Sequence, residues 1–296
     1  MNNENPTPEQ SRTDLLDVHH IRYIAVAFGF SWIIWIGAWI LGRTMGVEAL
    51  FNEEFVWRVL FERDVSADVL IVSLVSLVAV FGPMIGGIYA SRRDPTIPKG
   101  ALAGSVRRVG VGRLNYLIML AALALVVIPA LLISIVAVDR TADGPTLGQL
   151  GPFLIVFFVV QLFTSGTEEI GWRGYLVEKY LPGRDFWEAG WNIGFVWAAW
   201  HVPVVVMIFA QQGMLPVQIV GSLAGFAMGT VAMSIFHTWF YGRTGSVFFN
   251  VVIHAAFNTL PLTIVLLFEG SPAALVSNLT LWVGLIYLRK REKSHA

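Results

Sequence analysis

Long apolar stretches separated by short polar segments dominate the chain. Eight of them are long enough to cross the hydrocarbon core of a bilayer, which takes about 20 helical residues. They run approximately over residues 23–42, 68–91, 114–138, 151–166, 191–210, 217–241, 247–268 and 272–288. We therefore predict an all-α fold, a polytopic membrane helical bundle of about eight transmembrane helices. The fourth stretch is short, but we expect its helix to continue to Tyr180, because residues 168–180 contain no proline.

Composition agrees with a membrane protein. The chain is 56% hydrophobic and only 14% charged, with a mean hydropathy of +0.67, whereas soluble domains carry about 25% charged residues. It has no cysteine, which rules out disulfides, a thiol nucleophile and a thiolate metal site. The net charge is zero and no basic stripe is present, so we predict no nucleic-acid partner.

The basic residues predict how the chain crosses the membrane. With the N-terminus in the cytoplasm, only four of the 20 Lys and Arg residues fall on the outer side, as positive-inside topology requires. We predict a multi-pass protein of the cell membrane with both termini cytoplasmic. Residues 1–20 and 291–296 are predicted as cytoplasmic tails, the first of them disordered, and residues 21–290 as a single transmembrane domain. The outer loop over residues 47–64 is either an amphipathic helix at the interface or an ordinary structured loop.

Three of the apolar stretches contain polar groups that lipid tolerates poorly. An ionisable group at this depth costs roughly 2.5–3.5 kcal/mol and is retained mostly for function. These groups are Glu168, Glu169 and Arg173 in the fourth stretch, His201 in the fifth, and His254 and Asn258 in the seventh. At about 1.5 Å of rise per helical residue, the predicted topology places four of them, Glu168, His201, His254 and Asn258, in one layer. We therefore predict one buried site.

The residue types suggest hydrolysis of an amide bond. A carboxylate beside an imidazole in a partly dry cavity can activate water. His254 and Asn258 are four residues apart on one helix face and can donate two hydrogen bonds to one oxyanion. Glu169 and Arg173 have the spacing of an ion pair. The alternative for each group is a purely structural contact between helices.

Three motifs in this region resemble those of a known family. EExxxR matches Glu168-Glu169-Ile-Gly-Trp-Arg173, FxxxH matches Trp197-Ala-Ala-Trp-His201, and HxxxN matches His254-Ala-Ala-Phe-Asn258. The chain thus resembles the CAAX-protease and bacteriocin-processing (Abi) family of intramembrane proteases, which includes the type II CAAX prenyl endopeptidases. The match covers about residues 163–261, within a family-like core at about 151–268. Trp197 departs from the usual phenylalanine and is expected to keep an aromatic wall.

The resemblance implies roles for these residues. Glu168 would be the general base, His201 would help to bind and polarise water, and His254 and Asn258 would form the oxyanion site. Glu169, Arg173 and Trp197 would support them. The substrate would be a membrane-tethered protein or peptide, of prenylated CAAX type or bacteriocin type, and the site would open towards the cytoplasm.

Several alternatives stay open. The same protease could use zinc held by Glu168, His201 and His254, since two histidines and a carboxylate form a known catalytic set. We favour a metal-free site without a cofactor, because no HExxH helix is present. A non-enzymatic scaffold or immunity protein of the same fold is a second alternative. An ion- or proton-coupled transporter ranks last, because the polar groups all lie in the second half of the chain.

Overall fold

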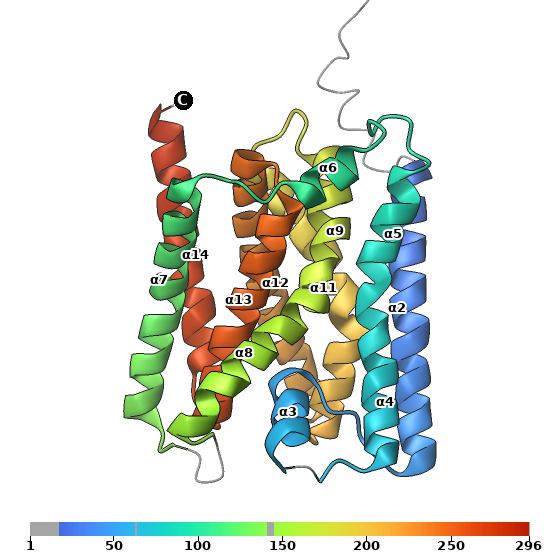
Figure 1. Ribbon diagram of the computed structural model, residues 1–296, viewed down its shortest axis with the longest axis vertical. Coiled ribbons are helices and arrows are strands. Elements are labelled where there is room, and N and C mark those ends of the chain that lie inside the picture. The colour runs from blue at the N-terminus through green and yellow to red at the C-terminus, as the bar shows by residue number, and fades with distance from the viewer. Residues whose placement is uncertain (1–17, 63, 141–144, 296) are drawn as a thin grey trace, which may run out of the picture.

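The computed structural model describes residues 18–62, 64–140 and 145–295, and these residues fold into helices without a β-strand. The predicted all-α membrane bundle is therefore confirmed (Figure 1). The longer helices are α2 (Val18–Met45), α4 (Ala67–Val78), α5 (Gly82–Ser91), α7 (Arg113–Ala137), α8 (Leu147–Phe163), α11 (Phe186–Gln211), α12 (Pro216–Thr244), α13 (Val247–Leu267) and α14 (Ala273–His295). The shorter elements are α3 (Asn52–Trp57), η2 (Arg58–Glu62), η3 (Ala79–Phe81), α6 (Ala101–Arg107), η4 (Ser165–Glu168), α9 (Glu169–Gly171), η5 (Trp172–Leu176) and α10 (Val177–Tyr180).

Among the described residues, seven helical segments are long and apolar enough to cross a membrane. They correspond to the first seven predicted stretches. The fourth runs from Gly148 through the glutamates to Tyr180, as expected, but it is not one regular helix, because α8 ends at Phe163. The eighth stretch forms α14, which packs along α7 (Figure 1). This helix is not among the seven, since its apolar part is followed by the charged residues of its last two turns.

The ends of the chain differ from the predicted tails. Residues 1–17 lie outside the described residues, but residues 18–20 already belong to α2. His20 is buried there, and its Nε2 lies 3.1 Å from the hydroxyl of Tyr180, so this part of the predicted tail is tied to the bundle. Residues 291–295 continue α14 as helix.

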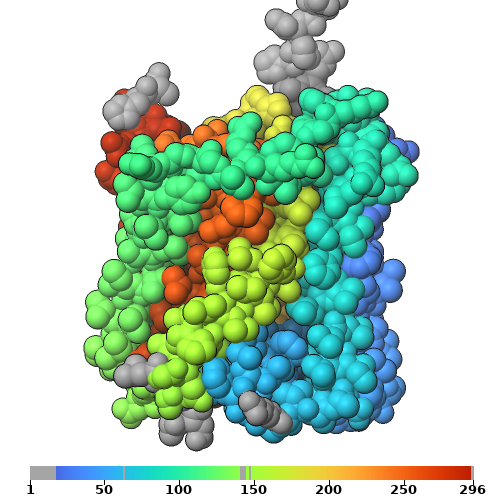
Figure 2. All heavy atoms as spheres, in the orientation of Figure 1, coloured from blue at the N-terminus to red at the C-terminus, as the bar shows by residue number. Residues whose placement is uncertain are grey.

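In the segment after α2, residues 52–62 are helical, as α3 and η2, and a position of this helix at the membrane interface stays a prediction. Its Val56 and Trp57 are buried against Phe153 and Phe157 of α8. Figure 2 shows α8 crossing the face of the molecule obliquely, with α3 beside its lower part. α3 therefore closes one end of the bundle, opposite the end where α6 lies (Figure 1).

Glycines allow the glutamate-bearing segment to lie very close to α5. A Cβ atom on Gly87 of α5 would lie 2.8 Å from the Cα of Gly171 in α9, and a Cβ on Gly171 would overlap the carbonyl oxygen of Pro83. Real Cβ atoms do not approach backbone so closely. The two backbones therefore pack directly against each other, which fixes the position of α9.

Candidate functional site

A break in the fourth membrane segment presents the two glutamates. Helix α8 ends at Phe163, and Thr164 has φ −112° and ψ −98°, outside helical geometry. The next turn, η4, ends at Glu168, and Glu169 begins α9. A Cβ on Gly166 in this turn would lie 2.8 Å from Val251 of α13, so the turn packs closely on that helix. Neighbouring glutamates here point to different partners.

Glu168 is buried and is held by two indole groups. Its Oε2 accepts hydrogen bonds from Nε1 of Trp197 at 2.8 Å and from Nε1 of Trp172 at 3.2 Å. Both bonds go to the same oxygen, so Oε1 is not used by them. Trp197 thus forms more than an aromatic wall, because phenylalanine has no N–H to donate.

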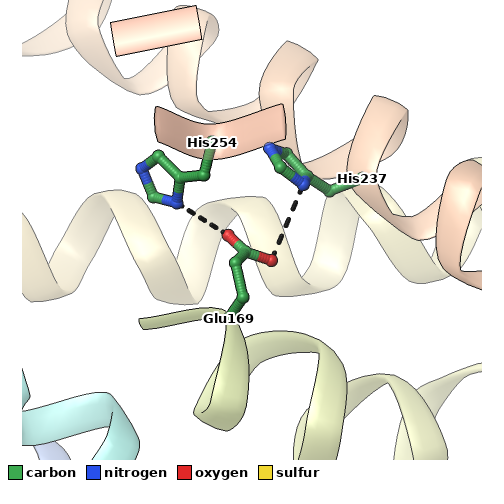
Figure 3. Close-up of side chains that lie close together, drawn as sticks. All are labelled: Glu169, His237 and His254. Carbon is green, nitrogen blue, oxygen red and sulfur yellow. Dashed lines mark hydrogen bonds and ion pairs between the residues drawn. The ribbon is translucent and has the colours of Figure 1, made fainter. Parts of the chain in front are cut away.

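Glu169 lies at the centre of a fully buried network. Its carboxylate lies 3.2 Å from the Arg173 guanidinium, the predicted pair, and its Oε1 lies 2.8 Å from Nδ1 of His254. Nδ1 of His237 lies 3.6 Å from Oε2 (Figure 3). Arg173 also donates to the carbonyl oxygen of Ser234 at 3.1 Å. The network joins α9 and η5 to α12 and α13, although its members are far apart in the chain.

His237 and Gln161 are not among the predicted site residues. Nδ1 of His237 lies 2.8 Å from Oδ1 of Asn250, whose amide donates to the carbonyl oxygen of Ser246 at 2.8 Å. Gln161 accepts a hydrogen bond from Asn258 at 3.0 Å. Both residues are buried polar groups inside apolar stretches, which is the signal that singled out the other site residues.

His201 is anchored through one ring nitrogen. Its Nδ1 lies 3.0 Å from the carbonyl oxygen of Trp197, one turn earlier in α11. Since a carbonyl oxygen only accepts, Nδ1 is the donor and Nε2 has a free lone pair in the neutral ring. The ring packs edge-on against Trp200 and Phe226. His201 therefore has one nitrogen available for a further contact.

A cavity of about 370 Å³ brings the predicted residues together. Its lining contains Glu168, His201, His254 and Asn258, together with Trp197. Glu169 and Arg173 do not line it; they lie behind His254 as its hydrogen-bonded support. The four residues expected to carry the chemistry thus share one cavity, and the supporting pair does not reach it.

The cavity extends from the glutamates towards α3. Phe51 and Phe55 line it at that end, as does Ala274 in the first turn of α14. On the opposite side of the glutamates, towards α6, space is filled by side chains: Tyr175 and Leu176 are fully buried, and Leu102 of α6 packs against Gly174. Which end of the bundle faces the cytoplasm stays a prediction. The basic residues predict that the end with α6 is the cytoplasmic one (Figure 1), and the cavity extends away from that end.

An acidic residue outside the membrane segments secures the loop after α5. Asp94 Oδ2 lies 2.7 Å from Nζ of Lys179 and accepts from the hydroxyl of Tyr175 at 3.0 Å, while Oδ1 accepts from the backbone and hydroxyl of Thr96. Burial alone would raise the pKa of Asp94, but the bonds from Lys179, Thr96 and Tyr175 outweigh it and lower the pKa to about 2. The loop is thereby fastened to the segment that contains the glutamates.

Histidines and carboxylates at the site offer donor atoms of the kind that bind zinc. Among the described residues, Glu169, His237 and His254 have ligand atoms within 4.8 Å of one another, and the predicted set of Glu168, His201 and His254 is not such a group. The compact group lies beside the Arg173 guanidinium, which opposes a second cation. Glu169, His237 and His254 are the described residues that could hold a metal ion, and this set differs from the predicted one by Glu169 and His237 in place of Glu168 and His201.

Comparison with known proteins agrees with the motifs. Residues 150–260 match the model of the family described as type II CAAX prenyl endopeptidase Rce1-like. The chain is also similar to CAAX prenyl protease 2 of Methanococcus maripaludis, with 25% identity over 107 residues. That alignment covers 36% of this chain and 39% of the relative. The matched segment contains the glutamates, His201, His254 and Asn258. The resemblance to the CAAX-protease and bacteriocin-processing family is therefore confirmed over this Rce1-like segment.

Proposed function

We propose that this multi-pass membrane protein is an intramembrane endopeptidase of the cell membrane that hydrolyses a peptide bond by direct attack of water. The observation that carries the proposal is the shared cavity of Glu168, His201, His254 and Asn258, supported by the match of residues 150–260 to a protease family. A carboxylate base, an imidazole and two potential oxyanion donors are the groups that amide hydrolysis requires.

In the first step, Glu168 accepts a proton from a water molecule as the water oxygen bonds to the carbonyl carbon of the substrate. The second O–H of this water donates a hydrogen bond to Nε2 of His201, because Nδ1 of that ring is already bonded to the carbonyl oxygen of Trp197. The carbonyl oxygen becomes an oxyanion. In the second step, the C–N bond breaks and Glu168 returns the proton to the amine that leaves, which restores the carboxylate. No covalent enzyme intermediate forms, and the protein's own side chains activate the water.

In this proposal His254 and Asn258 stabilise the oxyanion by donating hydrogen bonds to it. Nδ1–H of His254 donates a hydrogen bond to the Glu169 carboxylate. Nε2 of His254 can therefore donate to the oxyanion when the ring has a proton on both nitrogens. Glu169 stabilises that charged ring, and Arg173 balances the charge of Glu169. Asn258 adds an amide N–H, oriented by Gln161. The supporting network therefore positions a donor for charge that develops in the transition state.

The substrate in this proposal is a membrane-associated protein or peptide. The relative in Methanococcus maripaludis is named as a CAAX prenyl protease, which supports a substrate with a membrane anchor. Prenylated CAAX-type proteins and bacteriocin-type peptides are the two classes that the family resemblance suggests. A cavity buried among membrane segments suits a chain that is held at the bilayer rather than one free in solution.

The proposal is tested with purified protein in lipid vesicles and a library of membrane-tethered peptides. The unmodified protein should cleave at least one peptide, and Glu168→Gln should lower kcat by about 10²–10⁴-fold, the usual contribution of a general base. Glu188→Gln, the same chemical change at the exposed start of α11, is the control and should keep full activity. Equal cleavage by Glu168→Gln, or no cleavage of any peptide, would overturn the proposal. A scaffold would instead retain its cellular phenotype with Glu168→Gln.

A further inference from the structure

A group of exposed arginines lies at the end of the bundle where α6 lies. The connection from α6 to α7 runs across that end (Figure 1), and residues 95–138, which include it, contain four basic residues and no Asp or Glu. Arg243, near the end of α12, lies beside this connection, because its Nε donates to Oδ1 of Asn115 at 3.3 Å. The arginine cluster, as we call it, consists of the exposed residues Arg107, Arg108, Arg113 and Arg243.

Two of these guanidinium groups are held in place by neutral partners. Nη1 of Arg108 donates to the carbonyl oxygen of Thr244 at 3.3 Å. The guanidinium of Arg243 lies 4.9 Å from the centroid of the Trp239 ring, in addition to its bond to Asn115. A carbonyl, an indole and an amide bear no net charge, so these contacts position the guanidinium groups and leave their positive charge uncompensated.

No carboxylate of the described residues forms an ion pair with the arginine cluster. Two acidic side chains on neighbouring elements are bonded elsewhere: Glu178 accepts from the Tyr241 hydroxyl at 2.7 Å, and Glu292 accepts from Nε1 of Trp239 at 3.2 Å. Like charges repel one another, so arginines gathered in one region favour the binding of an anion from outside the chain.

Exposed apolar side chains accompany the arginines. Val109, Leu114 and Leu117 have exposed fractions of 56%, 62% and 62%. Arg113 begins α7, a segment apolar enough to cross a membrane, so its first turns belong at the boundary between hydrocarbon and headgroups. Cationic and apolar side chains on one segment match a molecule that joins an anionic headgroup to acyl chains. A water-soluble anion would use only the arginines.

We propose that the arginine cluster binds the headgroup of an anionic phospholipid, whose acyl chains lie along the exposed apolar side chains of α7. Guanidinium groups suit this role, because they can form two parallel hydrogen bonds to a phosphate. The lipid site is distinct from the cavity, since none of the four arginines lines it. Lipid binding there is independent of the proposed reaction.

The lipid site is joined to the helix that carries part of the candidate active site. The backbone carbonyl of Arg108 accepts a hydrogen bond from the hydroxyl of Ser246. The same hydroxyl accepts from the backbone N–H of Phe249 at 2.9 Å and so caps α13. His254 and Asn258 lie further along that helix. A bound headgroup would therefore stabilise the start of α13.

The experiment measures binding through thermal stability, since a ligand that binds the folded state raises Tm. The purified full chain in neutral detergent is heated with increasing dioctanoylphosphatidylglycerol, with zwitterionic dioctanoylphosphatidylcholine, or with glycerol 1-phosphate, and tryptophan fluorescence reports unfolding. Phosphatidylglycerol should bind about tenfold more tightly than phosphatidylcholine, or more, because each arginine near an anionic headgroup contributes about fivefold in affinity. Glycerol 1-phosphate, which lacks acyl chains, should not raise Tm at the same concentrations.

Substitutions test whether the arginine cluster is the site. Arg108→Gln with Arg243→Gln should weaken the binding of phosphatidylglycerol by about fivefold for each guanidinium lost. Arg107→Gln with Arg113→Gln changes side chains that bond to no other described residue, so this pair serves if the first does not fold. It should weaken binding in the same direction.

The matched control is Arg22→Gln with Arg92→Gln. This pair removes the same charge at exposed positions of α2 and just after α5, on the side of the bundle away from α7 (Figure 1), and it should keep the preference for phosphatidylglycerol. Glu168→Gln should keep the preference too, because Glu168 lies at the cavity. Failure of the proposed function would therefore leave this measurement intact.

Four results would overturn the inference. They are equal stabilisation by the two lipids, an equal effect of glycerol 1-phosphate, undiminished binding in both arginine pairs of the cluster, and a loss of the preference in the control as large as in those pairs. The last result would mean that net charge alone attracts the lipid.

Discussion

The hydrogen bond from Trp197 to Glu168 offers a sharp test of how the candidate base is held. Trp197→Phe keeps an aromatic ring at the position and removes the indole N–H, which donates to Oε2 of Glu168 at 2.8 Å. The longer bond from Trp172, at 3.2 Å, remains. The buried carboxylate would therefore lose the shorter of its two fixed donors and with it part of its orientation towards the cavity.

The expected magnitude follows from the kind of bond that is lost. A hydrogen bond to a charged group contributes about 1.5–3 kcal/mol, which corresponds to roughly 10- to 150-fold in rate when it acts on the transition state. Trp197→Phe should therefore lower kcat by about that factor with little change in KM. Trp172→Phe removes the longer bond and should have a smaller effect. Phenylalanine is the residue that the resembled family motif usually has at this position.

Cleavage of a membrane-tethered peptide by protein in vesicles measures the effect. Trp191→Phe is the control, because it makes the same change in size on the same helix, six residues earlier, at an indole that contacts Trp282 and Phe195 instead of the glutamates. The control should retain activity. If Trp197→Phe were as active as the control, the indole bond would have no part in holding the base, and the reasoning would be refuted.

Two further predictions concern stability. Asp94→Asn should destabilise the folded protein by about 2 kcal/mol at neutral pH, because the folded-state pKa of about 2 lies below the unfolded value of about 3.9; this stabilisation is present above about pH 4 and lost as the pH falls towards 2. Denaturant unfolding at several pH values checks it, and an unchanged pH dependence in Asp94→Asn would contradict it. Gly171→Ala should cost about 1–3 kcal/mol or more, because its Cβ would overlap backbone at Pro83, whereas Gly225→Ala, with nothing within 4 Å, should be neutral or slightly stabilising. Thermal unfolding compares the two, and equal stability would count against the close packing.

Much of the fold follows from hydropathy along the chain. The cost of exposing backbone polar groups to lipid forces long apolar stretches into helices, so the seven segments confirmed here are visible as stretches in the sequence. The end of α14 is harder to place, because its apolar and charged parts form one continuous helix. The first turn of α2 is also difficult to predict from sequence, because His20 belongs to a polar stretch. Its contact with the hydroxyl of Tyr180 is apparent only in the structure.

Some contacts of the candidate site also follow from the sequence, and others do not. Spacing within one helix predicts the pairing of Glu169 with Arg173, because residues four apart share a helix face. The partners of Glu168 do not follow from spacing, since Trp172 lies on its own segment and Trp197 on another helix. Gln161 and His237 are visible as polar residues in apolar stretches, but their roles depend on contacts with Asn258 and Asn250.

The sequence by itself determined that this protein is a helical membrane bundle and which polar residues its membrane segments must accommodate, because both follow from the local cost of placing groups in lipid. Tertiary structure alone decided that Glu169 contacts His254, 85 residues later in the chain. It also decided that the cavity extends towards α3. The physical reason is that contacts between helices depend on the rotation, tilt and breaks of each helix. The rotation and tilt of a helix are fixed by close backbone contacts, such as the one between Gly171 and Pro83. Hydropathy along the chain does not predict such contacts.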